Sequence, residues 1–396
     1  MKITGVKVIK RICNYVNRFP RDLGEITLPS TYNEYAYRQA PARPSAEKPG
    51  QRIAHFIEIN TDEGPSGQYG IIECKPELLA IMDGLKDYLI GKDPLDNRML
   101  WDMMIRYDRH ARSGVMLMAI SALDIALWDL KGKILGQPVY KLLGGGRSKV
   151  RPYVSALGFS VEPEAAKKRA LEIKAMGIRA QKWFFRYGPA HGAEGLRKNL
   201  DMAFALREAL GEDYEIMFDC SMNWTVNYAR KIFHELELVR PVWVEEVLRA
   251  HMIDGFKHLR DSTSIPLAAG EHIYTRMEVN AYLQDNVFAF MQSDPVWCGG
   301  ITESVKIADL CEMYGVTYAP HGHALMPAVH VVASMPPDVA PYCEYLIAIM
   351  DSKNAFFKDR PIDADGFISL NDTPGLGEEL DEARITSTEE IHSFEF

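Results

Sequence analysis

The sequence lacks the features that mark secreted, membrane and zinc-knuckle proteins. Its six cysteines are scattered without a CxxC pair, which argues against both a zinc knuckle and a disulfide framework. No uninterrupted apolar run approaches the roughly 18 residues that a membrane span needs, and the first ten residues alternate in polarity instead of forming a signal segment. We therefore expect a soluble protein of the reducing cytoplasm.

Positive charge is also scarce. Lys and Arg total 45 against 54 Asp and Glu, which gives a formal net charge of −9 and no global positive field, so we expect neither a nucleic-acid nor a membrane partner. Apolar residues, by contrast, are plentiful: 47% of the 396 residues are hydrophobic, which excludes disorder for most of the chain. This length predicts two domains, or one large barrel with an appendage.

The first region, residues 1–148, predicts an α+β domain. Strand signals cover 3–9, 53–59 and 70–73, and helical signals cover 76–90, 94–107 and 115–135. Residues 17–50 are rich in Pro, Arg and Tyr and lack periodicity; we interpret them as a loop that closes over a site, with disorder as the alternative. The tail, about 357–396, lacks a full helix signal and is expected to fold back onto this region.

The second region, residues 149–356, alternates short apolar runs with longer amphipathic segments. Strands are predicted over 153–157, 180–185, 214–219, 242–246, 266–271, 288–294, 317–321 and 342–347. Helices are predicted over 163–176, 195–210, 228–238, 255–262, 278–284, 304–314 and 324–335. Eight such units over about 200 residues predict an α/β fold, a (β/α)8-type barrel with the α+β domain as its cap.

Ionisable residues recur in the later strands of this predicted barrel. They are Asp219, Glu245, Glu271, Asp294, His321 and Glu344. They follow one another at intervals of 23 to 27 residues, and all but Glu344 stand at or next to the end of their run. A barrel of this period would bring them to its C-terminal rim, where the active sites of such barrels lie.

Three of these residues predict a metal site. Asp219, Glu245 and Glu271 come from adjacent strands and cannot stay close and ionised without a cation between them. Hard carboxylate oxygens suit Mg²⁺. The alternative is that acidic residues end strands simply because turns are polar, but near-constant spacing favours the metal site.

Asp294 and His321 end consecutive strands, so the carboxylate is placed to orient the imidazole as a general base. A core histidine is the alternative, and His323 completes a His-Gly-His pair that a metal-dependent hydrolase would carry on an earlier strand. Lys182 stands among apolar residues in a strand and therefore needs an acidic partner or an anionic ligand such as a substrate carboxylate. The alternative for Lys182 is a surface lysine.

Together these residues resemble the enolase superfamily and, within it, the mandelate racemase subgroup. The stretches that carry the resemblance are SALDIALWDLKGK (121–133), LLGG (142–145), MFDC (217–220), WVEE (243–246), AGEH (269–272), QSDPVWCGG (292–300) and APHG (319–322). The AGEH and WCGG stretches are most similar to sugar-acid dehydratases of the rhamnonate dehydratase type. The resemblance implies a barrel with an N-terminal cap.

The resemblance also implies roles for the rim residues. Asp219, Glu245 and Glu271 would hold Mg²⁺, and His321 backed by Asp294 would be the base. Glu344, in a protonated form, would hydrogen-bond the developing enediolate, and Lys182 would be a second donor. The racemases carry a second lysine two residues after the first, where this chain has Phe184.

We therefore expect a Mg²⁺-dependent dehydratase that removes the proton next to a sugar-acid carboxylate and eliminates the β-hydroxyl to give a 2-keto-3-deoxy acid. A racemase, epimerase or cycloisomerase of the same superfamily is the first alternative. A non-catalytic barrel that binds small acids is the second.

Recognition of the small-molecule substrate is assigned to a further set of polar and aromatic residues. The candidates are Trp183, Arg186, His272, Tyr37 and Arg38. For the last two, a solvated or interface face is an equal alternative. We also expect a homo-oligomer, since this fold commonly self-associates.

Overall fold

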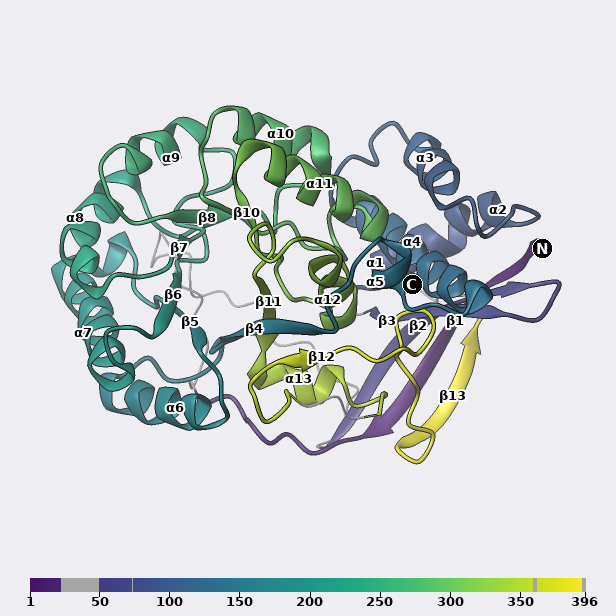
Figure 1. Cartoon of the computed structure of the whole chain (residues 1–396), viewed down its shortest axis with the longest axis horizontal. Coiled ribbons are helices and arrows are strands. Elements are labelled where there is room, and N and C mark those ends of the chain that lie inside the picture. The colour runs from purple at the N-terminus through teal and green to yellow at the C-terminus, as the bar shows by residue number, and fades with distance from the viewer. Residues whose placement is uncertain (23–49, 73, 359–361, 394–396) are drawn as a thin grey trace.

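The computed structural model describes residues 1–22, 50–72, 74–358 and 362–393. Within these ranges the chain forms a four-stranded antiparallel sheet with its helices, beside a parallel barrel of eight strands (Figure 1). This confirms the predicted fold. Most of the loop expected to close over the site, including Tyr37 and Arg38, lies outside the described residues. No helix in the described part of the chain is both long and apolar enough to span a membrane.

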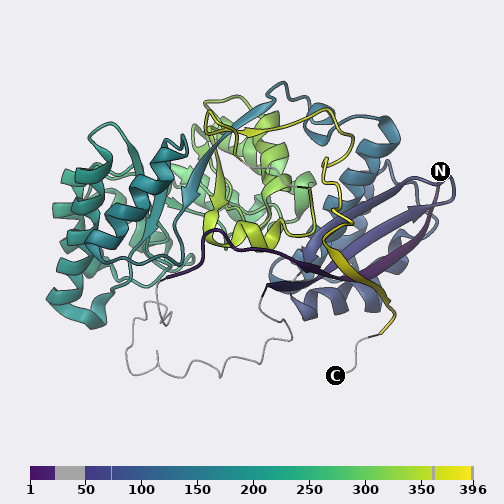
Figure 2. The same ribbon diagram turned by 90° about the horizontal axis from the view of Figure 1, so that it is seen from below.

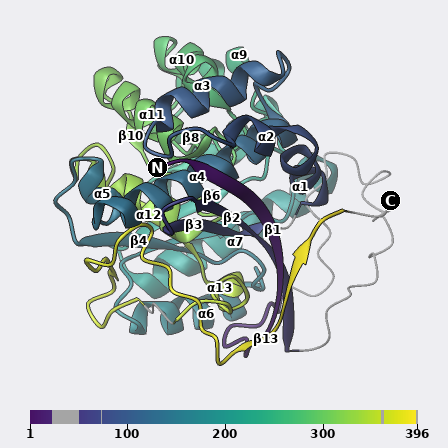
Figure 3. The same ribbon diagram turned by 90° about the vertical axis from the view of Figure 1, so that its right-hand side faces the viewer.

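The antiparallel sheet has the strand order β13-β1-β2-β3. Its strands are β1 (Ile3–Asn14), β2 (Gln51–Thr61), β3 (Ser66–Ile72) and β13 (Ile385–Ile391). The tail thus returns to the first region as predicted, and β13 lies along β1 (Figure 3). Alternate residues of the sheet, such as Ile57 and Ile59, are fully buried because the helices cover one face.

The helices of this domain are α1 (Lys75–Ala80), η1 (Ile81–Leu85), α2 (Lys86–Leu89), α3 (Asn97–Tyr107), α4 (Gly114–Leu135) and α5 (Val139–Leu142). The single helix predicted over 76–90 is divided by the π-helical turn η1. Helix α4 contacts the barrel through Asp124, whose carboxylate accepts hydrogen bonds from the backbone nitrogen and the hydroxyl of Thr302 at 2.9 and 2.6 Å. The capping domain is thereby fixed to the barrel.

The barrel strands run in the order β10-β9-β8-β7-β6-β5-β4-β11. They are β4 (Lys149–Ser155), β5 (Ala180–Phe184), β6 (Glu215–Asp219), β7 (Val244–Glu245), β8 (Leu267–Ala269), β9 (Phe290–Met291), β10 (Thr317–Tyr318) and β11 (Tyr342–Leu346). Each predicted strand is present, and the later ones are shorter than predicted. Strand β12 (Ile368–Ser369) pairs with β4 from outside the barrel.

Helices surround the strands, as Figure 1 shows. They are α6 (Pro163–Ala175), α7 (Gly192–Leu210), α8 (Val226–Leu236), α9 (Ile253–Arg260), α10 (Thr275–Gln284), α11 (Gly300–Tyr314), α12 (Leu325–Ser334) and α13 (Ile347–Lys353). The seven helices predicted from the sequence are all present, and the segment after β11 holds only the short α13.

The inside of the barrel explains why the rim residues face one another. A buried cluster includes Ala180, Met217, Trp243, Ala319 and Tyr342. Because side chains alternate along a strand, the residue two positions further on points to the same side. Those residues are Lys182, Asp219, Glu245, His321 and Glu344. The polar residues therefore form the layer directly above an apolar core.

Gly67 in β3 is a position where the two layers of the capping domain meet without space for a side chain. A Cβ there would contact the backbone oxygen of Ala126 and would lie 2.5 Å from Leu130 Cβ, both on α4. We expect Gly67→Ala to destabilise the protein by about 1–3 kcal/mol, as overpacking does. Thermal melting checks this, with Gly5→Ala in β1 as the matched control because a Cβ there meets nothing within 4 Å. Equal melting temperatures for the two variants would contradict the packing argument.

Candidate active site

Lys182 lies at the centre of the polar layer. Its Nζ is 2.5 Å from Glu245 Oε1, 2.9 Å from Glu344 Oε1 and 3.9 Å from Asp219 Oδ2, and the side chain is buried. Burial alone would lower the pKa of Lys182, but the charges of Glu245 and Glu344 raise it well above its ordinary value. Lys182 is therefore a buried ammonium among carboxylates, which excludes the alternative of a surface lysine.

Glu245 has two further partners that the sequence analysis missed. Trp243 Nε1 donates to Glu245 Oε2 at 3.0 Å, and Gln292 Nε2 donates to the same oxygen at 2.6 Å. Burial raises the pKa of Glu245 to about 7, although Lys182 opposes the shift. Trp243 was detectable as the residue two positions before a predicted ligand, on the same side of its strand.

His321 and Asp294 form the predicted pair. His321 Nδ1 lies 2.6 Å from Asp294 Oδ2, and Asp294 is fully buried. The other ring nitrogen, Nε2, lies 3.4 Å from Glu271 Oε2 and 3.8 Å from Glu344 Oε2. Burial would lower the pKa of His321, but the charges of Glu271 and Glu344 and the bond to Asp294 raise it to about 10. The imidazole is thus oriented through Nδ1, and Nε2 faces the other rim residues.

The indole of Trp297, which the sequence analysis noted only as part of the WCGG stretch, lies beside this pair. The ring of Trp297 stacks on His321 with centroids 4.9 Å apart, and on His272 with centroids 5.7 Å apart and 6° between planes. His323 contacts the same indole at 5.0 Å. Trp297 therefore fixes the positions of three imidazole rings at the mouth of the barrel.

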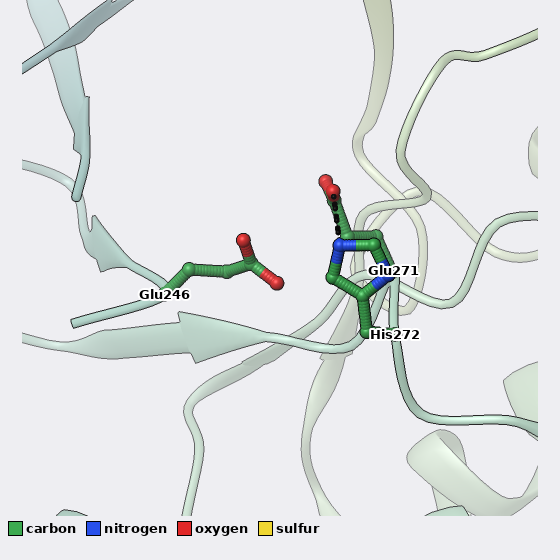
Figure 4. Close-up of side chains that lie close together, drawn as sticks. All are labelled: Glu246, Glu271 and His272. Carbon is green, nitrogen blue, oxygen red and sulfur yellow. Dashed lines mark ion pairs between the residues drawn. The ribbon is translucent and has the colours of Figure 1, made fainter. Parts of the chain in front are cut away.

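The carboxylates that a metal would need are present, but they are arranged differently from the expected trio. Among the described residues, the group of three whose ligand atoms all lie within 4.8 Å is Glu246, Glu271 and His272 (Figure 4). Asp219 and Glu245 are not gathered so tightly with Glu271, because Lys182 holds the carboxylate of Glu245. Glu246 directly follows β7 with a left-handed backbone, φ 46°, which turns its side chain toward Glu271.

The charge of the site fits a hard divalent cation. Burial, with the charge of Glu271, raises the pKa of Asp219 and raises that of Glu246 well above its ordinary value. Carboxylates crowded in this way favour a proton or a cation between them. In addition, the buried Oε1 of Gln292 has no hydrogen-bond partner in the described residues. Oxygen donors of this kind suit Mg²⁺.

Of the three predicted substrate contacts among the described residues, the structure places one at the site. Trp183 is fully buried on the side of β5 opposite Lys182, and its Nε1 donates to Gln181, whose amide in turn reaches Ala170 of α6. The prediction that Trp183 contacts substrate is therefore wrong, because the alternation of the strand turns it outward. Arg186 is partly buried and makes no hydrogen bond or ion pair among the described residues. His272 does lie at the site, with Nε2 3.1 Å from Glu271 Oε1.

Two family models match the chain. Residues 165–384 match the family described as enolase C-terminal domain-like, and residues 31–144 match the mandelate racemase / muconate lactonizing enzyme N-terminal domain. The chain is 31% identical to an L-rhamnonate dehydratase of Saccharopolyspora erythraea over 333 residues, 82% of each chain.

Solved structures give the same result. Rhamnonate dehydratase from Gibberella zeae, complexed with Mg, is similar with a TM-score of 0.80 at 27% identity, covering 96% of this chain and 94% of that one. The 3,6-anhydro-D-galactonate cycloisomerase from Zobellia galactanivorans is similar with a TM-score of 0.77 at 26% identity, covering 98% of this chain and all of that one.

Proposed function

Because the chain belongs to the enolase superfamily, with a mandelate racemase / muconate lactonizing enzyme N-terminal domain, we propose that it is a Mg²⁺-dependent sugar-acid dehydratase that uses one base. One arrangement carries the proposal. His321 is paired with Asp294, and on β5 the inward-facing residue that follows Lys182 is Phe184. Phe184 is buried and apolar, so it neither takes nor returns a proton. Proton transfer is thereby restricted to the His321 side of the substrate.

The proposed reaction begins at His321 Nε2, which removes the proton next to the substrate carboxylate while Asp294 stabilises the imidazolium that forms. Lys182 donates a hydrogen bond to a carboxylate oxygen as negative charge develops there; losing one such donor costs about 3–4 kcal/mol. The imidazolium then gives its proton to the departing β-hydroxyl, which leaves as water with the electron pair of its bond. The enol that remains ketonises to the 2-keto-3-deoxy acid.

Asp219, Glu245 and Glu271 would hold the Mg²⁺, with Glu246 and His272 beside them. When bound, the cation would supply Lewis-acid stabilisation of the substrate carboxylate and offset the carboxylate charges around His321. Lys182 now neutralises Glu245, so the lysine is already placed next to the position where a substrate carboxylate would bind.

For Glu344 we propose a role that differs from the protonated donor expected from the sequence. Burial would raise its pKa, but the charges of Lys182 and His321 lower it, and Gly322 N donates to Oε2 at 3.0 Å. The group is therefore held as a carboxylate. We propose that Glu344 positions Lys182, at 2.9 Å, for the enediolate.

The alternatives make different products. A racemase or epimerase needs a second base, and Phe184 occupies that position. A cycloisomerase forms a ring without loss of water, and a non-catalytic barrel turns nothing over.

Incubation with a panel of sugar acids and Mg²⁺, followed by a semicarbazide assay for 2-keto product, tests the proposal. Undiminished product formation in excess chelator would contradict the metal requirement. Self-association remains a prediction.

Asp294→Asn is expected to lower kcat on the order of 10²-fold, because the imidazole loses the charge that orients it and supports its proton. The pKa of His321 is raised partly by Asp294, so removal of that charge lowers it. The base form then persists to lower pH, and the acid limb of the kcat/KM profile moves to lower pH. A rate-versus-pH series measures both effects, and an unchanged profile would remove Asp294 from the pair.

A further inference from the structure

Lys353 ends α13, near the proposed base, and forms no ion pair with a carboxylate of the described residues. Its Nζ donates to the backbone oxygen of His323 and lies 3.3 Å from His323 Nδ1. Glu378 lines the same small cavity, but the described residues form no ion pair with the Lys353 ammonium. A partly buried cation in this position favours an anion that binds from outside the chain.

Arg21 lies on the neighbouring part of the rim. The segment that follows β1 passes from the antiparallel sheet to the barrel (Figure 2): Arg18 binds Asp351 of α13 at 2.5 Å, and Asp22 N donates to Gly158 O after β4 at 3.1 Å. The side chain of Arg21 packs against Gly158, and it makes no hydrogen bond or ion pair with any described residue. Arg21 is exposed, so its guanidinium is accessible to a ligand.

The positive charges of this part of the rim act on one another. Burial, with the charges of Arg52 and Arg21, lowers the pKa of Lys353 to about 8, although Asp294 and Glu344 oppose the shift. Like charges gathered in a partly buried place destabilise one another unless an anion joins them. These charges lie beside the proposed active site.

The order of the barrel strands shows on which side of the barrel Lys353 and Arg21 lie, relative to the proposed metal ligands. In a closed ring of eight strands, β7 lies opposite β11 and β8 lies opposite β4. The proposed metal carboxylates Glu245 and Glu271 end β7 and follow β8. Lys353, by contrast, ends the helix that follows β11, and Arg21 packs against Gly158, which follows β4. A substrate held by its carboxylate at the metal side would therefore extend its far end toward the two cations.

We propose that Lys353 and Arg21 bind a second carboxylate at the far end of the substrate, so that the natural substrate is a dicarboxylic sugar acid. The inference rests on the proposed function and narrows its substrate class. The two cations would form charge-assisted hydrogen bonds with a terminal carboxylate and weaker ones with a neutral hydroxyl, so the enzyme would prefer a diacid to the matching monoacid.

The test uses pairs of acids that share every stereocentre and differ only in the terminal group, such as galactarate with galactonate and mannarate with mannonate. Hexaric, hexonic, pentaric and pentonic acids are assayed with Mg²⁺ for 2-keto product, and their binding is measured by calorimetry. We expect kcat/KM for the best diacid to exceed that of its monoacid by about 10²-fold, since a hydrogen bond to a charged group contributes about 1.5–3 kcal/mol.

Two variants and one control test whether Lys353 and Arg21 cause the preference for the diacid. Lys353→Met and Arg21→Gln are each expected to lower kcat/KM for the diacid about 10- to 100-fold, mainly through KM, and to leave the monoacid unchanged. Arg21 is exposed, so its replacement does not endanger folding. Lys257→Met is the matched control. Lys257, on α9, is also partly buried, but its ammonium pairs with Asp285 at 2.5 Å.

The outcomes separate this inference from the proposed function. Turnover of monoacids in preference to diacids, or an equal loss for both in the two variants, would overturn the inference and leave a dehydratase. Diacid binding that depends on Lys353 without any 2-keto product would support the inference and contradict the dehydratase. Binding of neither member of any pair would overturn the inference.

Discussion

His321→Asn is expected to abolish dehydration and exchange of the α-proton together, with a loss of at least about 10²-fold in each. Nε2 of His321 is the basic atom that faces the proposed metal ligands, and Phe184 offers no substitute on the other side. Turnover is followed as 2-keto product, and exchange is followed by proton NMR in D₂O. His258→Asn on the exposed side of α9 controls for the loss of a histidine as such.

A variant that loses product but still exchanges the α-proton at the wild-type rate would show that another group removes that proton. His272 would then be the first residue to replace, because its ring also stacks on Trp297 and its Nε2 lies 3.1 Å from Glu271 Oε1. Thermal melting of each variant separates a chemical loss from unfolding.

The second large effect is expected at the metal site. Glu245→Gln should weaken Mg²⁺ binding by more than about 10-fold, since even a residue that only supports a ligand costs 10- to 100-fold when replaced. Glu246→Gln is the matched variant on the next residue and should cost less. Calorimetric titration with Mg²⁺ alone measures both affinities without reference to activity.

The pair of variants distinguishes two ligand sets that share Glu271. If Glu246→Gln loses the metal and Glu245→Gln retains it, then the group in Figure 4, Glu246 with Glu271 and His272, is the metal site. Glu245 would then serve only to hold Lys182. If both variants bind Mg²⁺ as the wild type does, neither Glu245 nor Glu246 is a metal ligand.

The sequence predicts the barrel well because each strand carries a short apolar run before a polar residue. The run that holds Met217 and Phe218 must be buried, so Asp219 emerges at its end, and the same logic applies to Glu245 and His321. Residues that face the barrel axis follow from the period of two along a strand. The positions of the proposed base and ligands are therefore readable from the sequence.

The directions of side chains beyond the strand ends are not readable in this way. Trp183 was predicted to contact substrate, but it directly follows Lys182, and one step along a strand reverses the side to which a side chain points. The left-handed backbone of Glu246 and the stacking of Trp297 on His272 and His321 depend on how loops from different strands meet. A period within one strand carries no information about those contacts.

The central claim is a dehydration in which proton transfer occurs on the His321 side alone. Proton and carbon NMR of the wild-type reaction in D₂O with Mg²⁺ tests it most directly, on whichever sugar acid the panel identifies. The account predicts a 2-keto-3-deoxy acid with solvent deuterium at C3 and no epimer of the remaining substrate at C2. Accumulation of the C2 epimer, with the β-hydroxyl retained, would contradict it.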